Sequence, residues 1–232
     1  MIKILSYDSP DLEQYARSPG YQSDLAAVRA VYSGQGLLET AGAFVFLTYL
    51  TLPALTAVRP PYARDSLARS TLDGAAERVF LLRLLGLTAE PAWSKGIGNA
   101  KVRKQAEMLA RRHAEFPGMR QDYIDFLAAL IALAPLLVRL EAGQPPSSTH
   151  FRGYWRYMSA AMSLITAKLS GEWEEEQKCR VFSERNAGLS SDGEAMLTAF
   201  AARHPEHVAA ALPVLFPRPR SVVRTLLGGF DA

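Results

Sequence analysis

Leucine and alanine recur along this chain at intervals of three and four residues, and no stretch shows sustained alternation of apolar and polar residues. The first spacing places apolar side chains on one face of an α-helix, because a helix completes a turn every ~3.6 residues. Glycine and proline separate the apolar segments, as at Gly86, in the Pro60-Pro61 pair and in the Phe-Pro-Gly turn at 116–118. The pattern predicts an all-α fold.

We expect one globular domain over residues 1–232, with about eight helices around an apolar cavity that could hold a cofactor. No internal repeat or biased linker divides the chain. The expected helices cover residues 23–33, 37–52, 65–85, 101–115, 121–141, 150–169, 173–186, 192–203 and 205–212, with a short one in the C-terminal tail.

The composition is that of a soluble globular protein, with 49% apolar and 21% charged residues. A net charge of +3, with basic and acidic residues interspersed, argues against a nucleic-acid partner. The apolar stretches 43–58 and 124–140 fall short of the ~20 apolar residues of a membrane span, so both are interpreted as buried helices. A single cysteine, Cys179, permits no intrachain disulfide, and we expect a cytoplasmic protein without a signal peptide.

His113 is the residue most suggestive of chemistry. Within the expected helix 101–115, Val102, Ala106, Leu109 and His113 share one face, which predicts an inward imidazole. Such a histidine can ligate a haem iron or zinc, or it can be a core residue hydrogen-bonded to a backbone carbonyl. Periodicity alone favours the core residue.

Other polar features carry weaker signals. His204 and His207 are three residues apart but flank a proline that begins a new helix, and Cys179 has no nearby histidine or glycine-rich turn. The acidic run EWEEEQK (172–178) is interpreted as a solvated helix start.

The segment VRKQAEMLARRHAEFPGMRQDYIDFLAALIALAP (102–135) resembles the central block of the MpaB and latex-clearing-protein family of b-type haem oxygenases. The matching positions are His113, Phe116, Asp122, Leu127 and Pro135. Downstream, YWRYMSAAMSLI (154–165) is similar to the family's tryptophan- and methionine-containing helix through Trp155 and Met162, and FVFLTYLTLPAL (44–55) looks like the helix that lines its substrate cavity. The similarity is specific only across 102–165.

The resemblance implies an all-α protein that binds haem b, with His113 as the axial iron ligand and Phe116 beside the cofactor. The family oxidises hydrophobic substrates, including cleavage of isoprenoid double bonds with dioxygen. It usually carries an Arg and a Thr four residues apart near the haem, and the corresponding stretch here, STLDGA (70–75), supplies Thr71 and Ala75 instead. Arg69 and Thr71 are therefore the candidate catalytic residues.

Three functions remain open from the sequence. The first is a haem b-dependent oxidoreductase that uses dioxygen or peroxide on a hydrophobic small molecule such as a polyketide or terpenoid. The second is a haem-free cyclase or isomerase on the same scaffold, which the missing Arg/Thr pair favours. The third is a non-catalytic binder of a lipophilic ligand.

Overall fold

The computed structural model describes residues 10–57, 76–115, 118–166 and 169–228, and within these ranges the chain is helical and contains no strand. The all-α prediction is therefore confirmed. The α-helices are α1 (Pro10–Arg17), α2 (Gly20–Val31), α3 (Leu37–Leu50), α4 (Pro53–Ala57), α6 (Ala76–Leu84), α7 (Ala100–Glu115), α8 (Gln121–Glu141), α9 (Ser148–Met162), α10 (Glu172–Asn186), α11 (Ser191–Arg203), α12 (Pro205–Ala211) and α13 (Pro217–Leu227), with 3₁₀ turns η1 (Gly96–Gly98) and η2 (Leu212–Val214).

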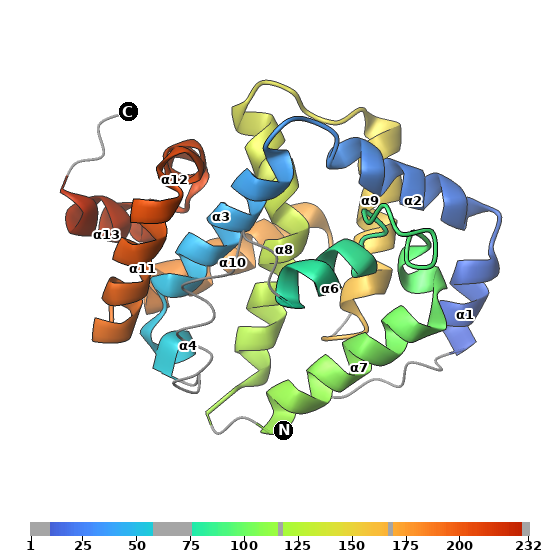
Figure 1. Ribbon diagram of the computed structural model, residues 1–232, viewed down its shortest axis with the longest axis horizontal. Coiled ribbons are helices and arrows are strands. Elements are labelled where there is room, and N and C mark those ends of the chain that lie inside the picture. Colours follow the sequence, from blue (N-terminus) through green and yellow to red (C-terminus); the bar gives the residue numbers. More distant parts are fainter. Residues whose placement is uncertain (1–9, 58–75, 116–117, 167–168, 229–232) are drawn as a thin grey trace.

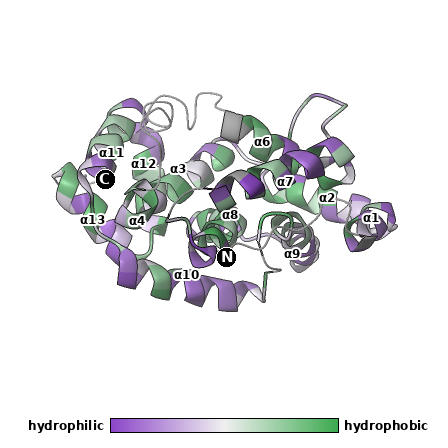
Figure 2. Ribbon diagram, turned by 90° about the horizontal axis from the view of Figure 1, so that it is seen from below, coloured by the Kyte–Doolittle hydropathy of each residue, from purple (hydrophilic) through white to green (hydrophobic). Residues whose placement is uncertain are grey.

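Helix α8 lies at the centre of the molecule (Figure 1). It packs against α3, which in turn contacts α12 and α11, and on its far side it packs against α10. The pair α2 and α9 forms a second, closely packed unit beside it. Figure 2 shows α10 on one side of α8 and α6 and α7 on the other, with hydrophilic residues along the outer surface of α10.

The sequence of α8 explains its central place. Its residues are apolar nearly all the way round, and Leu130, Leu133 and Ala134 are fully buried. Such a helix is stable only when other elements cover every face. Within the described residues α8 alone is long and apolar enough to cross a membrane, and 61% of its most apolar window is buried inside the protein. We interpret it as a core helix.

Helix ends follow local chemistry. Ser147 caps α9 by accepting a hydrogen bond from the backbone N–H of His150 (3.3 Å), and Ser190 caps α11 in the same way through Gly193 (3.0 Å). Gly86, two residues after α6, adopts a φ of 65°, the left-handed conformation that commonly closes a helix. The two serine side chains thus satisfy backbone N–H groups that the helices leave unpaired.

The predicted helices 101–115 and 121–141 agree with α7 and α8 to within one residue. The described residues contain twelve α-helices, more than the expected eight or so. Helices α1 and α4 have no counterpart among the expected ranges, because they have too few residues to show a periodic pattern. The predicted helix 150–169 ends earlier, since after Met162 the backbone changes to tighter hydrogen bonds such as Ile165 N–H to Met162 O (2.9 Å). Only the end of the predicted helix 65–85 lies within the described residues.

Buried tyrosines fix the turn η1 between α6 and α7. The Tyr157 hydroxyl accepts a hydrogen bond from Ile97 N–H (3.0 Å) and donates one to the Leu84 carbonyl (2.6 Å). The Tyr21 hydroxyl accepts one from Gly98 N–H (2.7 Å) and donates one to a neighbouring carbonyl of the same turn. We call this the tyrosine-anchored turn. Burial raises the pKa of Tyr157 well above its ordinary value, so this hydroxyl stays protonated.

Candidate functional site

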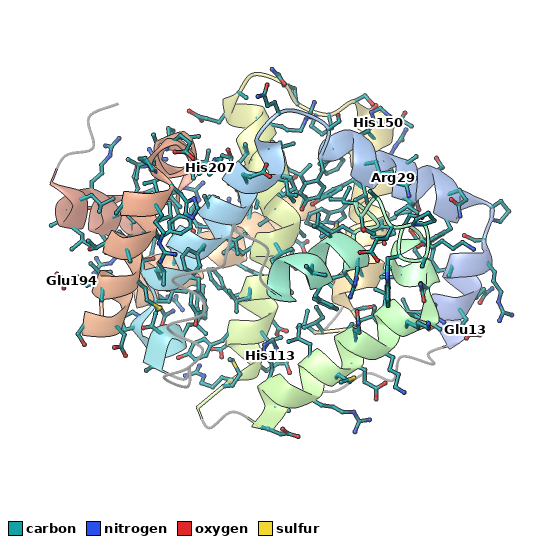
Figure 3. All side chains as sticks on the ribbon, in the orientation of Figure 1. Glu13, Arg29, His113, His150, Glu194 and His207 are labelled. Carbon is teal, nitrogen blue, oxygen red and sulfur yellow. The ribbon has the colours of Figure 1, made fainter. Side chains whose placement is uncertain are left out.

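His113 lies on the last turn of α7 (Figure 3) and is half-buried. The predicted inward face of α7 is confirmed at Val102 and Ala106, which are fully buried, whereas Leu109 is half-buried like His113. Ala110 is the buried residue on the following turn, because the buried face advances by four residues at each step. The imidazole is thus at the edge of the core rather than within it.

The orientation of the His113 ring matters for ligation. Its Nδ1 atom is buried. A haem b site needs one axial nitrogen from the protein beside an apolar surface. A half-buried imidazole can supply such a nitrogen. The other predicted site residues, Arg69, Thr71 and Phe116, lie outside the described residues.

The remaining motif positions are divided between surface and core. Asp122 lies near the surface, where it accepts a hydrogen bond from Arg120 Nε (3.0 Å). Pro135 and Met162 are buried, and the half-buried Trp155 donates its indole N–H to the Ser170 carbonyl (2.9 Å). None of these residues lies on α7 with His113.

The other histidines stand apart from His113. His150 is exposed at the start of α9, and the rings of His204 and His207 lie 6.2 Å apart at the junction of α11 and α12. Within the part of the chain that the structure describes, no group of three or more His, Cys, Asp or Glu side chains could hold a metal ion.

A pocket of about 330 Å³ lies between the N-terminal half of α8, helix α10 and the segment after α9. Its volume is within the range of small-molecule sites, roughly 300–1,000 Å³. Helices α8 and α10 supply most of its lining, and Figure 2 shows α7 on the other side of α8 from α10. Its lining residues are Asp122, Asp125, Phe126, Ala129, Thr166, Leu169, Glu175, Lys178, Cys179 and Phe182. We call it the α8–α10 pocket.

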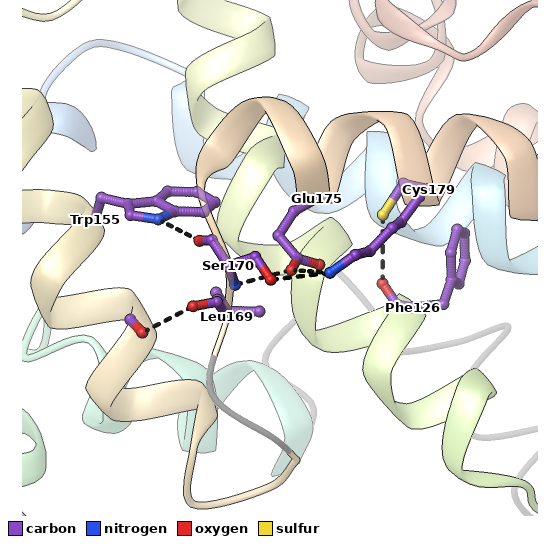
Figure 4. Close-up of polar contacts among 8 residues, drawn as sticks. Phe126, Trp155, Leu169, Ser170, Glu175 and Cys179 are labelled. Atoms are coloured by element: carbon purple, nitrogen blue, oxygen red, sulfur yellow. Dashed lines mark hydrogen bonds and ion pairs between the residues drawn. The ribbon is translucent and has the colours of Figure 1, made fainter.

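The Glu175 carboxylate of this pocket is hydrogen-bonded to neighbouring residues (Figure 4). Glu175, only 7% exposed, accepts hydrogen bonds from Ser170 N–H (2.9 Å) and from Lys178 Nζ (2.8 Å). Lys178 also donates to Ser170 Oγ (3.0 Å). The hydrogen bond with Glu175 raises the pKa of Lys178, so this ammonium stays protonated at neutral pH.

A second polar group surrounds Asp125. Gln121 Nε2 donates hydrogen bonds to Asp125 Oδ1 (2.7 Å) and to Thr166 Oγ1 (3.2 Å). Asp125 is half-buried, and its carboxylate takes part in no ion pair with the described residues. Lys178 is near enough for the Asp125 charge to raise its pKa, but the ammonium contacts Glu175 and Ser170.

The opposite wall of the pocket is aromatic and sulfur-containing. Phe126 and Phe182 are stacked with ring centroids 4.5 Å apart. The buried Cys179 thiol points toward the Phe126 carbonyl (3.9 Å), and burial raises the pKa of Cys179 well above its ordinary value. A thiol held in the protonated form is a poor nucleophile, so Cys179 forms part of the wall rather than a reactive centre.

The sequence did not predict this pocket. The acidic run 172–178 was expected to be a solvated helix start, which is wrong for Glu175, because that carboxylate turns inward to the Ser170 N–H and Lys178. A signal was present in the spacing, since Glu175, Cys179 and Phe182 stand at i, i+4 and i+7 on α10. Gln121 and Thr166, by contrast, are 45 residues apart and meet only in the folded chain.

Comparisons of this chain with protein-family models, with curated proteins and with solved structures find no match. The resemblance to the MpaB and latex-clearing-protein family stays a prediction that rests on the residues of the segment 102–165.

Proposed function

We propose that this protein is a haem b-dependent oxidoreductase that acts on a hydrophobic small molecule, with His113 as the axial iron ligand. The observation that carries the proposal is the position of His113 on the last turn of α7, half-buried and with Nδ1 turned inward. The helix–turn–helix order of α7 and α8 also agrees with what the resemblance implies for this block.

When bound, haem would supply the activation of dioxygen or peroxide toward an alkene substrate. The residues of this chain would hold the cofactor and exclude water from it. His113 would donate Nε2 to the iron. Arg69, Thr71 and Phe116 are proposed from the resemblance as the other residues near the cofactor.

A haem titration tests this proposal. The purified protein, His113→Ala and the control His150→Ala are each titrated with hemin and followed by absorption in the Soret region. We expect one haem per chain for the parent and for the control, since His150 is exposed on another helix. His113→Ala should lose the shifted Soret band. A second variant, His113→Gly, should also lose the band and should regain it when imidazole is added. Equal spectra for the parent and His113→Ala would overturn the proposal.

One observation favours a second candidate function that needs no haem. The protein would then be a cyclase or isomerase, or a non-catalytic binder of a lipophilic ligand. The α8–α10 pocket has the volume of a ligand site, and His113 is not among its lining residues. This candidate predicts that turnover, or ligand retained in native mass spectrometry, survives His113→Ala. If His113→Ala keeps its fold by circular dichroism but loses turnover and ligand retention, this second candidate is excluded.

A further inference from the structure

We propose that the α8–α10 pocket binds a small organic cation, an ammonium group carried on an apolar body, with Asp125 as its charge partner. The inference rests on the second candidate only in taking this pocket as a ligand site. It is independent of haem, because His113 does not line the pocket.

The charges of the pocket lining point to a cation. Among the described residues that line it, Asp122, Asp125 and Glu175 carry carboxylates and Lys178 carries an ammonium. Lys178 contacts Glu175 at 2.8 Å, and Asp122 is paired with Arg120 from outside the lining. Asp125 is then the carboxylate whose charge the described residues leave uncompensated. A cation bound there would form an ion pair, which Asp125 does not make with the described residues.

The apolar wall decides what kind of cation fits. Phe126 and Phe182 offer aromatic surface, and Ala129 and Leu169 complete the apolar side of the lining. Aromatic faces attract cations and bury an apolar group. The carboxylates do not converge as metal ligands do, since no described group of three or more such side chains could hold a metal ion. An organic ammonium therefore suits the pocket better than a divalent metal.

The test uses phenethylammonium chloride as the probe and neutral 2-phenylethanol as its uncharged counterpart. Binding to the full chain is measured by isothermal calorimetry at low salt, because salt screens exposed charges. Loss of one charge-assisted contact weakens binding by about tenfold or more. We expect the ammonium to bind at least about tenfold more tightly than the alcohol, and Asp125→Asn to remove that preference. The matched control is Asp122→Asn, whose carboxylate already has Arg120 as a partner, and it should keep most of the preference.

Equal affinity of the two probes for the parent protein would overturn the proposal even if Asp125→Asn failed to fold. An unchanged preference in a folded Asp125→Asn would overturn the role of Asp125. The outcome is separable from the haem question, because His113→Ala should bind phenethylammonium as the parent does. A protein that binds hemin but not the ammonium would keep the haem proposal and refute this one.

Discussion

The tyrosine-anchored turn and the α8–α10 pocket both place polar groups beside aromatic side chains, yet they differ in where the polar groups point. At the turn, the hydroxyls of Tyr21 and Tyr157 are each hydrogen-bonded twice to backbone groups. In the pocket, Glu175 accepts hydrogen bonds from the Ser170 N–H and from Lys178, whereas Asp125 lies at the cavity and accepts one from the Gln121 amide. The polar groups of the turn are hydrogen-bonded within the protein, whereas the pocket leaves room for a ligand beside Asp125.

The difference separates stability from binding. Buried polar groups contribute to stability only when every donor and acceptor has a partner. The turn meets that condition, so changes there should cost much stability. The pocket meets it only in part, so changes there should cost little stability and should affect ligand binding instead.

The largest effect is expected for Gly96→Ala. Gly96 has a φ of 52°, and an added Cβ would meet the Tyr157 hydroxyl and approach the Leu84 carbonyl at 3.1 Å. The strained backbone and the clash together should lower the free energy of unfolding by about 3 kcal/mol or more. The control is Gly143→Ala, at a φ of 67° with nothing within 4 Å of its Cβ, which should cost only about 1 kcal/mol. Urea denaturation measures the free energy of unfolding of each variant. Equal losses in the two variants would contradict the close packing of Tyr157 against the turn.

Tyr157→Phe should have the next largest effect. It removes the hydroxyl that joins Ile97 N–H to the Leu84 carbonyl, and it leaves both backbone groups buried without that partner. We expect a loss of about 2 kcal/mol in the free energy of unfolding. Amide hydrogen exchange at Ile97 should accelerate in this variant, and unchanged exchange there would show that the hydroxyl does not hold the turn.

Cys179 should make stability depend on alkaline pH. Burial raises the pKa of the folded thiol, so it keeps its proton where the unfolded thiol loses its own, above about pH 8.5. The folded state then binds more protons, and its stability falls as pH rises. Between about pH 8 and pH 9.5 the parent should lose about 1 kcal/mol more than Cys179→Ala does. If the free energies of unfolding of the two proteins change in parallel with pH, burial of the Cys179 thiol is contradicted.

The smallest effect is expected for Glu175→Gln. The amide oxygen can still accept the Ser170 N–H, and the lost ion pair involves Lys178, whose side chain is 60% exposed. Pairs that solvent reaches contribute little, so the loss should be about 0.5 kcal/mol. Glu176→Gln, which breaks the pair with Arg180, is the matched control. A thermal-unfolding shift as large as that of Tyr157→Phe would erase the distinction between the two regions.

The sequence predicted most helices because their signals are local. The run of apolar residues from Ile124 onward and the polar ends at Gln121 and Glu141 determine α8 without reference to the rest of the chain. The pocket could not be predicted in the same way, because Asp125, Thr166 and Glu175 become neighbours only through packing of α8 on α10. His113 was found by spacing, but spacing could not tell that the end of α7 leaves it half-buried.

The central claim is that His113 holds haem. Its most direct test is the absorption spectrum of the freshly purified protein, with iron content measured on the same sample and His113→Ala prepared in parallel. We predict a Soret band and about one iron per chain for the parent, with both lost in the variant. A colourless, iron-free protein that stays so after hemin is added would contradict the claim.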